Sequence, residues 1–295
     1  MSIHASGALR DGVARGGPSR QERRNGLLPR SPAWLRALPT LFRIGFVGSI
    51  AYRAELIVWM FAYSMPLIML ALWTAVAREA PVGRFGEREF KAYFLATLVV
   101  RLVTGSWLVW ELTMDIRQGA LSGRLLRPIH PLLSYATENL GALPLKLVLT
   151  VPVVIASIAW VGPGVLTHDP VQVAILPLAL VGAWAITFCV MACIGSLAFF
   201  WESALSVFDL WLAVYIVLSG YVMPLELFPG WARDVLAWLP FRSMLSFPVE
   251  DALGLLDRSA SLRALAIQWA WVAVLLVLAL RCWRAGVRRF QAFGG

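Results

Sequence analysis

Charged residues are scarce in this chain of 295 residues. Only 15% of the residues are charged and 59% are hydrophobic, with a mean hydropathy of +0.72. Soluble globular domains carry about 25% charged residues. The shortage excludes an ordinary soluble domain and indicates an integral membrane protein. Because one span needs about 20 apolar residues, the chain is long enough for about five to seven membrane-crossing helices.

Metal-binding side chains are equally few. The three histidines are scattered over tail and loops, and the three cysteines, Cys189, Cys193 and Cys282, form no CxxC pair. No HExxH motif or comparable metal spacing occurs. We therefore interpret the cysteines as packed thiols rather than as disulfide partners or metal ligands.

The motifs of several enzyme classes are also missing. A phosphate-binding loop needs a lysine directly after a glycine, but Phe90 precedes Lys91 and Leu145 precedes Lys146, the only two lysines. There is no GxSxG nucleophile elbow and no clustered pair of carboxylates. We therefore expect neither a catalytic centre nor a cofactor in this chain.

Positive charge, in contrast, is in excess. The formal net charge is +9, and nearly all of the basic residues are arginines that lie in the tails and loops. Nucleic acid is one partner that could explain such an excess. Membrane topology and anionic lipid headgroups explain it more simply in a chain with several spans. We expect membrane lipids as partners and no nucleic acid.

The apolar runs predict an all-α integral membrane protein with six transmembrane helices. Residues 1–30 are rich in Gly, Ser, Pro and Arg, which is typical of a disordered basic tail. Residues 31–54 mix aromatic, aliphatic and arginine side chains and predict an interfacial amphipathic helix. A six-span domain follows over 55–285, and 286–295 form a basic tail. The spans are expected at about 55–77, 90–112, 134–161, 171–201, 205–222 and 262–282.

The distribution of basic residues predicts the orientation in the membrane. If the N-terminus is cytoplasmic, the cytoplasmic segments hold sixteen Lys and Arg residues and the external segments hold eight. Cytoplasmic loops carry the excess of Lys and Arg in membrane proteins. The count therefore predicts that both termini are cytoplasmic, which agrees with an even number of spans.

The segment 222–256 is too interrupted for a span and too apolar for a free loop. Prolines divide it, and Pro229-Gly230-Trp231 has the composition of a turn next to a headgroup anchor. Two short helices that lie on or dip into the outer membrane face would fit this pattern. The prolines are Pro224, Pro229, Pro240 and Pro248.

A polar, basic stretch over 111–132 separates two long apolar runs and predicts an amphipathic helix. Met114, Leu121 and Leu125 can share one helical face. Gly119 and Gly123 would weaken or bend the helix. Two prolines, Pro128 and Pro131, would end it.

Two motifs resemble bacterial ABC-2 type permeases. DIRQGALSGRLLRPIHPL is similar to the cytoplasmic loop of that family, and FPGWARDVLAWLPFRSMLSFPVEDALG is similar to the segment before its last helix. The likeness covers about residues 33–290 and is greatest to the compact six-span branch, which is akin to drug and antibiotic exporters.

The resemblance implies the membrane subunit of an ATP-driven exporter in a bacterial inner membrane. It implies two separate ATPase subunits that hold ATP and Mg²⁺, and a second permease that is either another copy or a sister chain. The substrate class would be drug-like, lipid or glycan. The outer-face segment, with Pro229, Gly230, Trp231 and Pro240, would cap the exit. The stretch over 111–132 would be the coupling helix, with Asp115, Ile116, Arg117, Gly119, Leu121, Arg124 and Arg127 as the coupling residues.

Arg101 lies in the middle of a predicted span, where a charge is costly. It lines a substrate route, or it snorkels, or it forms a structural ion pair, for which Glu138 is a candidate. The sequence is also compatible with two other functions. One is a membrane enzyme acting on a lipid or lipid-linked sugar, with Arg101 and the proline-rich segment as its headgroup site; the other is a stand-alone secondary transporter or channel.

Overall fold

The computed structural model describes residues 39–40, 42–43, 46–47 and 64–290. The predicted tail over 1–30 lies outside the described residues. So do most of the interfacial helix predicted over 31–54, the beginning of the first predicted span and residues 291–295.

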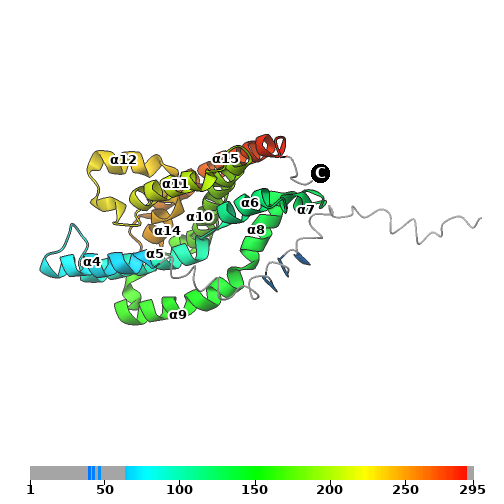
Figure 1. Cartoon of the computed structure of the whole chain (residues 1–295). Helices are drawn as coiled ribbons and strands as arrows, with labels where there is room; N and C mark the ends of the chain where they lie inside the picture. Colours follow the sequence, from blue (N-terminus) through cyan, green and yellow to red (C-terminus); the bar gives the residue numbers. More distant parts are fainter. Residues whose placement is uncertain (1–38, 41, 44–45, 48–63, 291–295) are drawn as a thin grey trace, which may run out of the picture. The chain divides into compact units, whose positions relative to one another are not determined.

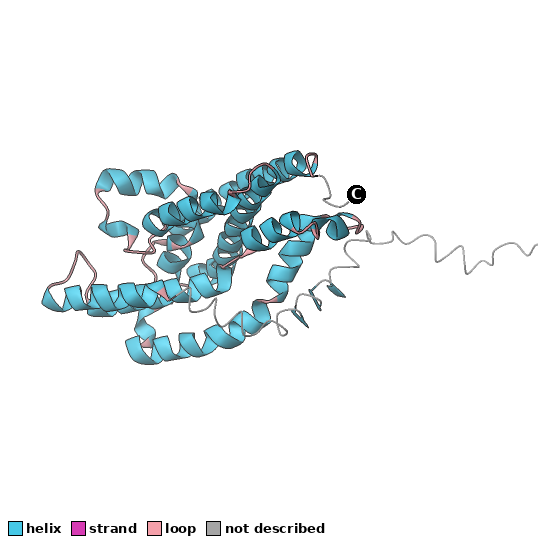
Figure 2. Cartoon of the chain, viewed as in Figure 1, coloured by secondary structure: helices cyan, strands magenta, loops and turns pink. Residues whose placement is uncertain are grey.

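The described part of the chain is helical, as predicted, and contains no β-strand beyond one isolated bridge between Val82 and Phe85 (Figure 2). The α-helices of residues 64–290, all but α13 labelled in Figure 1, are α4 (Met65–Glu79), α5 (Glu87–Thr104), α6 (Leu108–Arg117), α7 (Leu121–Leu125), α8 (Pro131–Gly141), α9 (Leu143–Val161), α10 (Pro170–Ser196), α11 (Ala204–Leu218), α12 (Gly230–Trp238), α13 (Pro240–Met244), α14 (Ser246–Ala252) and α15 (Arg258–Val287).

Within residues 64–290, four helical stretches are long and apolar enough to cross a membrane. They correspond to the second, third, fourth and sixth predicted spans and cover Glu87–Arg117, Pro131–Val161, Pro170–Phe199 and Arg258–Val287. Helix α11 is a shorter apolar helix of 15 residues. It ends at Leu218, before the predicted end near 222, because Gly220 takes a left-handed conformation with φ of 86°. Helix α4 is the described part of the first predicted span.

The stretches Glu87–Arg117 and Pro131–Val161 are each interrupted once. Helix α5 stops at Gly105, whose extended backbone separates it from α6, and α8 meets α9 at Ala142. A break at membrane depth leaves carbonyl groups without helical partners. The ammonium group of Lys146 donates to the Gly105 carbonyl oxygen at 2.8 Å, so this break is satisfied from the neighbouring helix.

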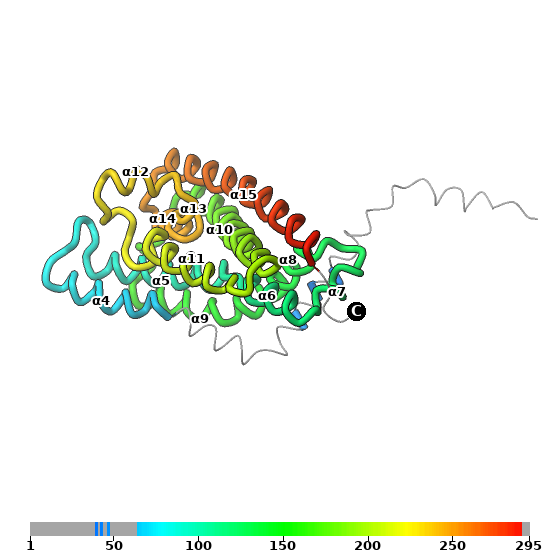
Figure 3. The backbone as a smooth tube through the Cα atoms, turned by 45° about the horizontal axis from the view of Figure 1, so that its top comes forward, coloured from blue at the N-terminus to red at the C-terminus, as the bar shows by residue number. Residues whose placement is uncertain are grey.

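Helix α10 packs against α15, α6, α14, α13 and α5 and lies beside α15 along its length (Figure 3). Gln268 of α15 is fully buried there and donates to the carbonyl oxygens of Ala179, at 2.9 Å, and Ser243, at 2.8 Å. Gly182 makes this approach feasible, because an added Cβ would lie 2.5 Å from Gln268 Oε1.

The segment after α11 differs from the prediction of two short helices. It contains three, α12, α13 and α14, after a 3-10 turn at Leu225–Leu227. Pro229 precedes α12 as its N-cap residue, and Pro240 is the first residue of α13. Proline is tolerated in the first turn, where its missing N–H is not needed. The prolines therefore start helices here, so the segment holds more helices than a breaker pattern predicts.

Candidate functional site

The stretch over 111–132 is not one helix, so that prediction is wrong. Helix α6 continues the preceding span to Arg117, Gly119 then reverses the chain with φ of 72°, and α7 forms a separate short helix. Pro131 begins α8 instead of ending a helix, and the His130 ring nitrogen Nδ1 accepts a hydrogen bond from the Leu132 N–H at 3.3 Å. The stretch is therefore a compact turn that connects two spans.

The predicted apolar face of that stretch is also wrong. Leu121 is fully buried, but Met114 is exposed. The left-handed turn at Gly119 changes the direction of the chain between the two residues. Residues before and after it therefore cannot follow one helical period, and Met114 and Leu121 do not share a face.

Arg124 of α7 holds this turn together. Its Nε donates to Asp115 Oδ2 at 2.8 Å, and its Nη1 donates to the two carboxylate oxygens of Glu138 at 2.7 and 3.0 Å. The guanidinium also lies 4.1 Å from the centre of the Tyr135 ring, whose hydroxyl donates to Asp115. Ser134 donates to Glu138 at 3.0 Å. We call Asp115, Arg124, Tyr135 and Glu138 the Arg124 cluster.

The Arg124 cluster is shielded from solvent. The side chains of Arg124, Asp115 and Glu138 are 21%, 22% and 25% exposed. Burial by itself would lower the pKa of Arg124, but Glu138, Tyr135 and Asp115 together raise it above its ordinary value. The guanidinium thus stays charged, and one cation serves two carboxylates. Charged hydrogen bonds of this kind are stronger than neutral ones, so α7 is fixed to both α6 and α8.

The structure separates the predicted coupling residues into inward-facing and outward-facing groups. Asp115 and Arg124 belong to the cluster, and Ile116 and Leu121 are buried. Arg117 is exposed and donates to the Glu202 carbonyl oxygen, so it joins the turn to the segment before α11. Gly119 forms the reversal, and Arg127 is exposed.

Leu126 is a further candidate that the sequence analysis missed. It is 87% exposed, directly between α7 and Arg127. Leu125 and Leu126 are adjacent in the sequence, and adjacent residues do not share a helical face. Because the apolar face is assigned to Leu125, the pair is the signal that Leu126 points elsewhere.

Arg101 is not paired with Glu138, so that suggestion is wrong. Glu138 faces α7 and binds Arg124 instead. Arg101 Nη1 donates to the Tyr215 hydroxyl at 3.3 Å, and the guanidinium lies 5.1 Å from the Tyr215 ring centre and 5.6 Å from that of Tyr221. Cation–π contacts of this kind stabilise a charge where water is scarce. Arg101 therefore joins α5 to the two ends of the segment 215–221.

The residues predicted for the outer-face segment lie at the start of two helices. Pro229 and Gly230 begin α12, Trp231 is 75% exposed, and Pro240 begins α13. They are distant in sequence from the Arg124 cluster, and none of them takes part in its hydrogen bonds. Among residues 64–290, no group of three or more His, Cys, Asp or Glu side chains is placed to hold a metal ion.

The comparison with known families agrees with the helical architecture. No curated protein matches the chain in sequence. The model of a family described as ABC-2 family transporter protein matches residues 67–294, which include the Arg124 cluster and all four long apolar stretches. The match covers well over half of the chain, and the chain therefore belongs to the ABC-2 family of transporter proteins.

Proposed function

We propose that this chain is the permease subunit of an ATP-driven ABC-2 exporter whose ATPase is a separate protein. Two ATPase subunits would supply hydrolysis with bound ATP and Mg²⁺, and a second permease, identical or a sister chain, would complete the pathway. The family membership supports this function. We place the chain in a bacterial inner membrane, on the resemblance of its two motifs to bacterial permeases. The distribution of its basic residues supports cytoplasmic termini.

The observation that carries the proposal is how the Arg124 cluster fixes the turn between two spans. Movement of a partner can reach the membrane only through rigid contact. Helix α7 is bonded through Arg124 to α6, which continues one span, and to α8, which begins the next. A push on α7 would therefore displace both spans together.

The docking surface would be the outward side of the same turn. Leu126 and Arg127 are exposed there, and so are Gln118 and Gly123 of the same turn. An exposed leucine with an arginine beside it suits a partner groove that is apolar at its floor and acidic at its rim. Asp115 and Arg124 would act behind this surface, by holding its shape.

A pull-down from the native membrane in gentle detergent tests the proposal. We expect a protein with Walker motifs to co-purify with the wild-type chain. Leu126→Glu and Arg127→Glu should reduce its recovery at least fivefold, with the amount of folded permease unchanged. Leu166→Glu is the matched control, because Leu166 is also an exposed leucine in a connecting segment but lies between α9 and α10.

Two outcomes would contradict the proposal. If the wild-type chain is recovered without an ATPase, the chain is not the subunit proposed here. If an ATPase is recovered equally with Leu126→Glu and Leu166→Glu, the docking surface lies elsewhere on the chain.

We further propose that Arg101 lines the substrate route, for a drug-like, lipid or glycan substrate. Its contacts with Tyr215 and Tyr221 place a charge and two aromatic rings together between α5 and the end of α11. Arg101→Lys keeps the charge, whereas Arg101→Ala removes it. If the residue acts on substrate, Arg101→Ala should impair transport more than it lowers the amount of folded protein. Equal losses of transport and folded protein would make Arg101 structural.

A further inference from the structure

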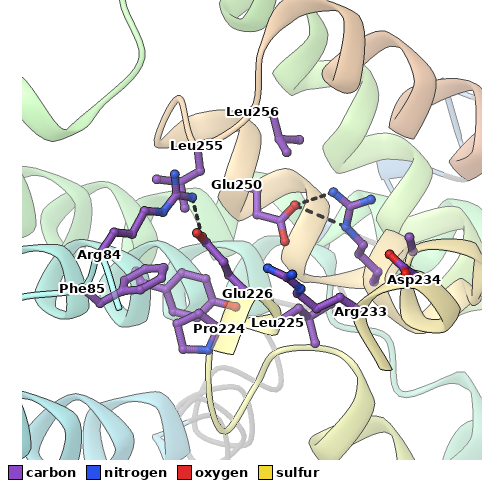
Figure 4. Close-up of a pocket in the computed structure, with 13 residues that line it drawn as sticks. Arg84, Phe85, Pro224, Leu225, Glu226, Arg233, Asp234, Glu250, Leu255 and Leu256 are labelled. Carbon is purple, nitrogen blue, oxygen red and sulfur yellow. Dashed lines mark hydrogen bonds and ion pairs between the residues drawn. The ribbon is translucent and has the colours of Figure 1, made fainter. Parts of the chain in front are cut away.

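A cavity of about 370 Å³ lies beside α12, far from the Arg124 cluster in the chain. It is open on one side and lined by the connection between α4 and α5, the turn at Leu225–Leu227, and helices α12, α13 and α14. Its size falls within the range of small-molecule sites. Six charged side chains line it, three of each sign: Arg84, Arg233, Arg242, Glu226, Asp234 and Glu250 (Figure 4). We call this cavity the α12 pocket.

Four of the six charges neutralise one another. Arg84 pairs with Glu226 at 2.6 Å, and Arg242 pairs with Glu250 at 2.7 Å. These two ion pairs, drawn as dashed lines in Figure 4, join separate segments around the rim. They account for the shape of the pocket and leave its ligand chemistry to the remaining two groups.

Arg233 and Asp234 form no ion pair with any residue that the structure describes. Both are exposed, and both line the cavity. In Figure 4, the guanidinium group of Arg233 is seen between the side chains of Glu226 and Glu250. Asp234 is seen to the right of these three side chains. The pocket therefore presents one available cation and one available anion at separate positions.

The other side of α12 indicates the depth of the pocket in the membrane. Trp231, Val235 and Trp238 recur at helical spacing and are all exposed, with the two tryptophans 75% and 69% exposed. Ala232 and Leu236 face the protein. Exposed tryptophans on a membrane protein gather at the level of the lipid headgroups. The Trp271 indole, on span α15, donates to the Trp238 carbonyl oxygen at 2.8 Å and holds the end of α12 against that span.

We propose that the α12 pocket binds a zwitterionic phospholipid headgroup. The phosphate would bind Arg233, whose planar guanidinium can donate two parallel hydrogen bonds to phosphate oxygens. The primary ammonium group would bind Asp234. Trp231 and Trp238 keep α12 at headgroup depth, so the ligand comes from a lipid rather than from free solute. The residues that line the pocket do not include Arg101 or the exposed residues Leu126 and Arg127 of the docking surface.

Native mass spectrometry of the full-length chain, purified in detergent, tests this assignment. The probes are phosphatidylethanolamine, phosphatidylglycerol, phosphatidylcholine and the soluble glycerophosphoethanolamine, each added separately. We expect phosphatidylethanolamine to be retained at least fivefold more than the other three. Phosphatidylcholine has the phosphate but no N–H to donate to Asp234, and phosphatidylglycerol has no cation.

Three variants divide the contributions of the two charges. Arg233→Gln should lower the retention of phosphatidylethanolamine at least fivefold, and Arg233→Lys should restore part of it. Asp234→Asn should abolish the preference for phosphatidylethanolamine over phosphatidylglycerol. Arg263→Gln is the matched control, since Arg263 is an exposed arginine near the start of α15 that does not line the pocket.

Three results would overturn the proposal. Equal loss of lipid in Arg233→Gln and Arg263→Gln would remove the site from the pocket. Preferred retention of phosphatidylglycerol by the wild-type chain would exclude a zwitterionic ligand. Retention of glycerophosphoethanolamine as strong as that of the lipid would exclude the bilayer as its source. Unfolding temperatures of all variants, measured alongside, confirm that the compared chains are folded.

Discussion

The Arg124 cluster and the α12 pocket use the same residue types in opposite ways. At α7, one guanidinium is shared by two carboxylates, and the side chains are about three-quarters shielded. At α12, two ion pairs form the rim, while Arg233 and Asp234 are left without ionic partners among the described residues. In the Arg124 cluster, the charges pair with one another and fix the turn at α7. In the α12 pocket, two charges stay available for a ligand.

Among the substitutions that test this difference, Arg124→Glu should cause the largest loss of stability. This change brings three carboxylates together where one cation had served two. Removing one partner of a shielded ion pair leaves the others unpaired, so we expect the free energy of unfolding to fall by roughly 2–3 kcal/mol. Thermal unfolding in detergent, followed by tryptophan fluorescence, measures the loss. Arg124→Lys, which keeps the charge but not the forked geometry, should lose less.

A variant Arg124→Glu that unfolds at the wild-type temperature would show that the cluster does not fix the turn. The neutral variant Glu138→Gln then serves as a second check. It removes one carboxylate and leaves the Asp115 pair, so its effect should lie between those of wild type and Arg124→Glu.

The turn itself is tested by two glycines that differ in backbone conformation. Gly119 has φ of 72°, whereas Gly123 lies within α7, and an added Cβ would meet nothing within 4 Å at either position. Gly119→Ala should therefore lower the free energy of unfolding by about 1 kcal/mol through backbone strain alone. Gly123→Ala should leave it unchanged or raise it, since alanine favours helix. Equal effects of the two substitutions would argue against a left-handed Gly119.

The rim of the α12 pocket should respond weakly to mutation. Arg84 and Glu226 are paired, but their side chains are 47% and 40% exposed. Exposed ion pairs contribute about 0.5 kcal/mol, and salt screens them. Arg84→Ala should therefore lower the unfolding temperature only slightly at low salt and not measurably at 0.5 M salt, a probe concentration of about three times physiological ionic strength. A loss as large as that of Arg124→Glu would erase the contrast between the two regions.

The smallest effect is expected from His130. Partial burial lowers the pKa of this imidazole, and the charge of Arg284 lowers it further. The folded chain then binds fewer protons than the unfolded chain, so stability is present above the ordinary histidine pKa and is lost as the pH falls through it. Protonation would also remove the acceptor that caps α8. The unfolding temperature of His130→Asn, which keeps a capping side chain, should fall less between pH 7.5 and pH 5.5, two probe conditions either side of that ordinary value. Equal falls would contradict a role for His130.

The long apolar helices are predictable from the sequence because their signal is local. A run of about 20 apolar residues has few alternatives to a membrane helix. The stretch over 111–132 was harder, since a single left-handed glycine divides what its composition presents as one helix. The partner of Arg124 could not be identified either. Glu138 lies in the next span, 14 residues away, and only the packing of α8 against α7 brings it into range.

The charges of the α12 pocket illustrate a second limit of sequence reasoning. Arg84 and Glu226 lie far apart in the chain, so their pairing depends on tertiary packing. Composition indicates how many charges a segment carries, but not which of them find partners. That distinction separates a structural rim from a binding site, and it depends on the tertiary structure.

The buried amide of Gln268 also determines how α10 and α15 can move. Its Nε2 donates to carbonyl groups on α10 and α13, in the gap left by Gly182. Sliding α15 by one residue, about 1.5 Å along its axis, would break both hydrogen bonds and strand an amide in an apolar interior. The hydrogen bonds of Gln268 therefore fix the axial register of α15 against α10. We expect spin labels on α10 and α15 to keep their separation during turnover, with displacement confined to the helices that are interrupted at Gly105 and Ala142.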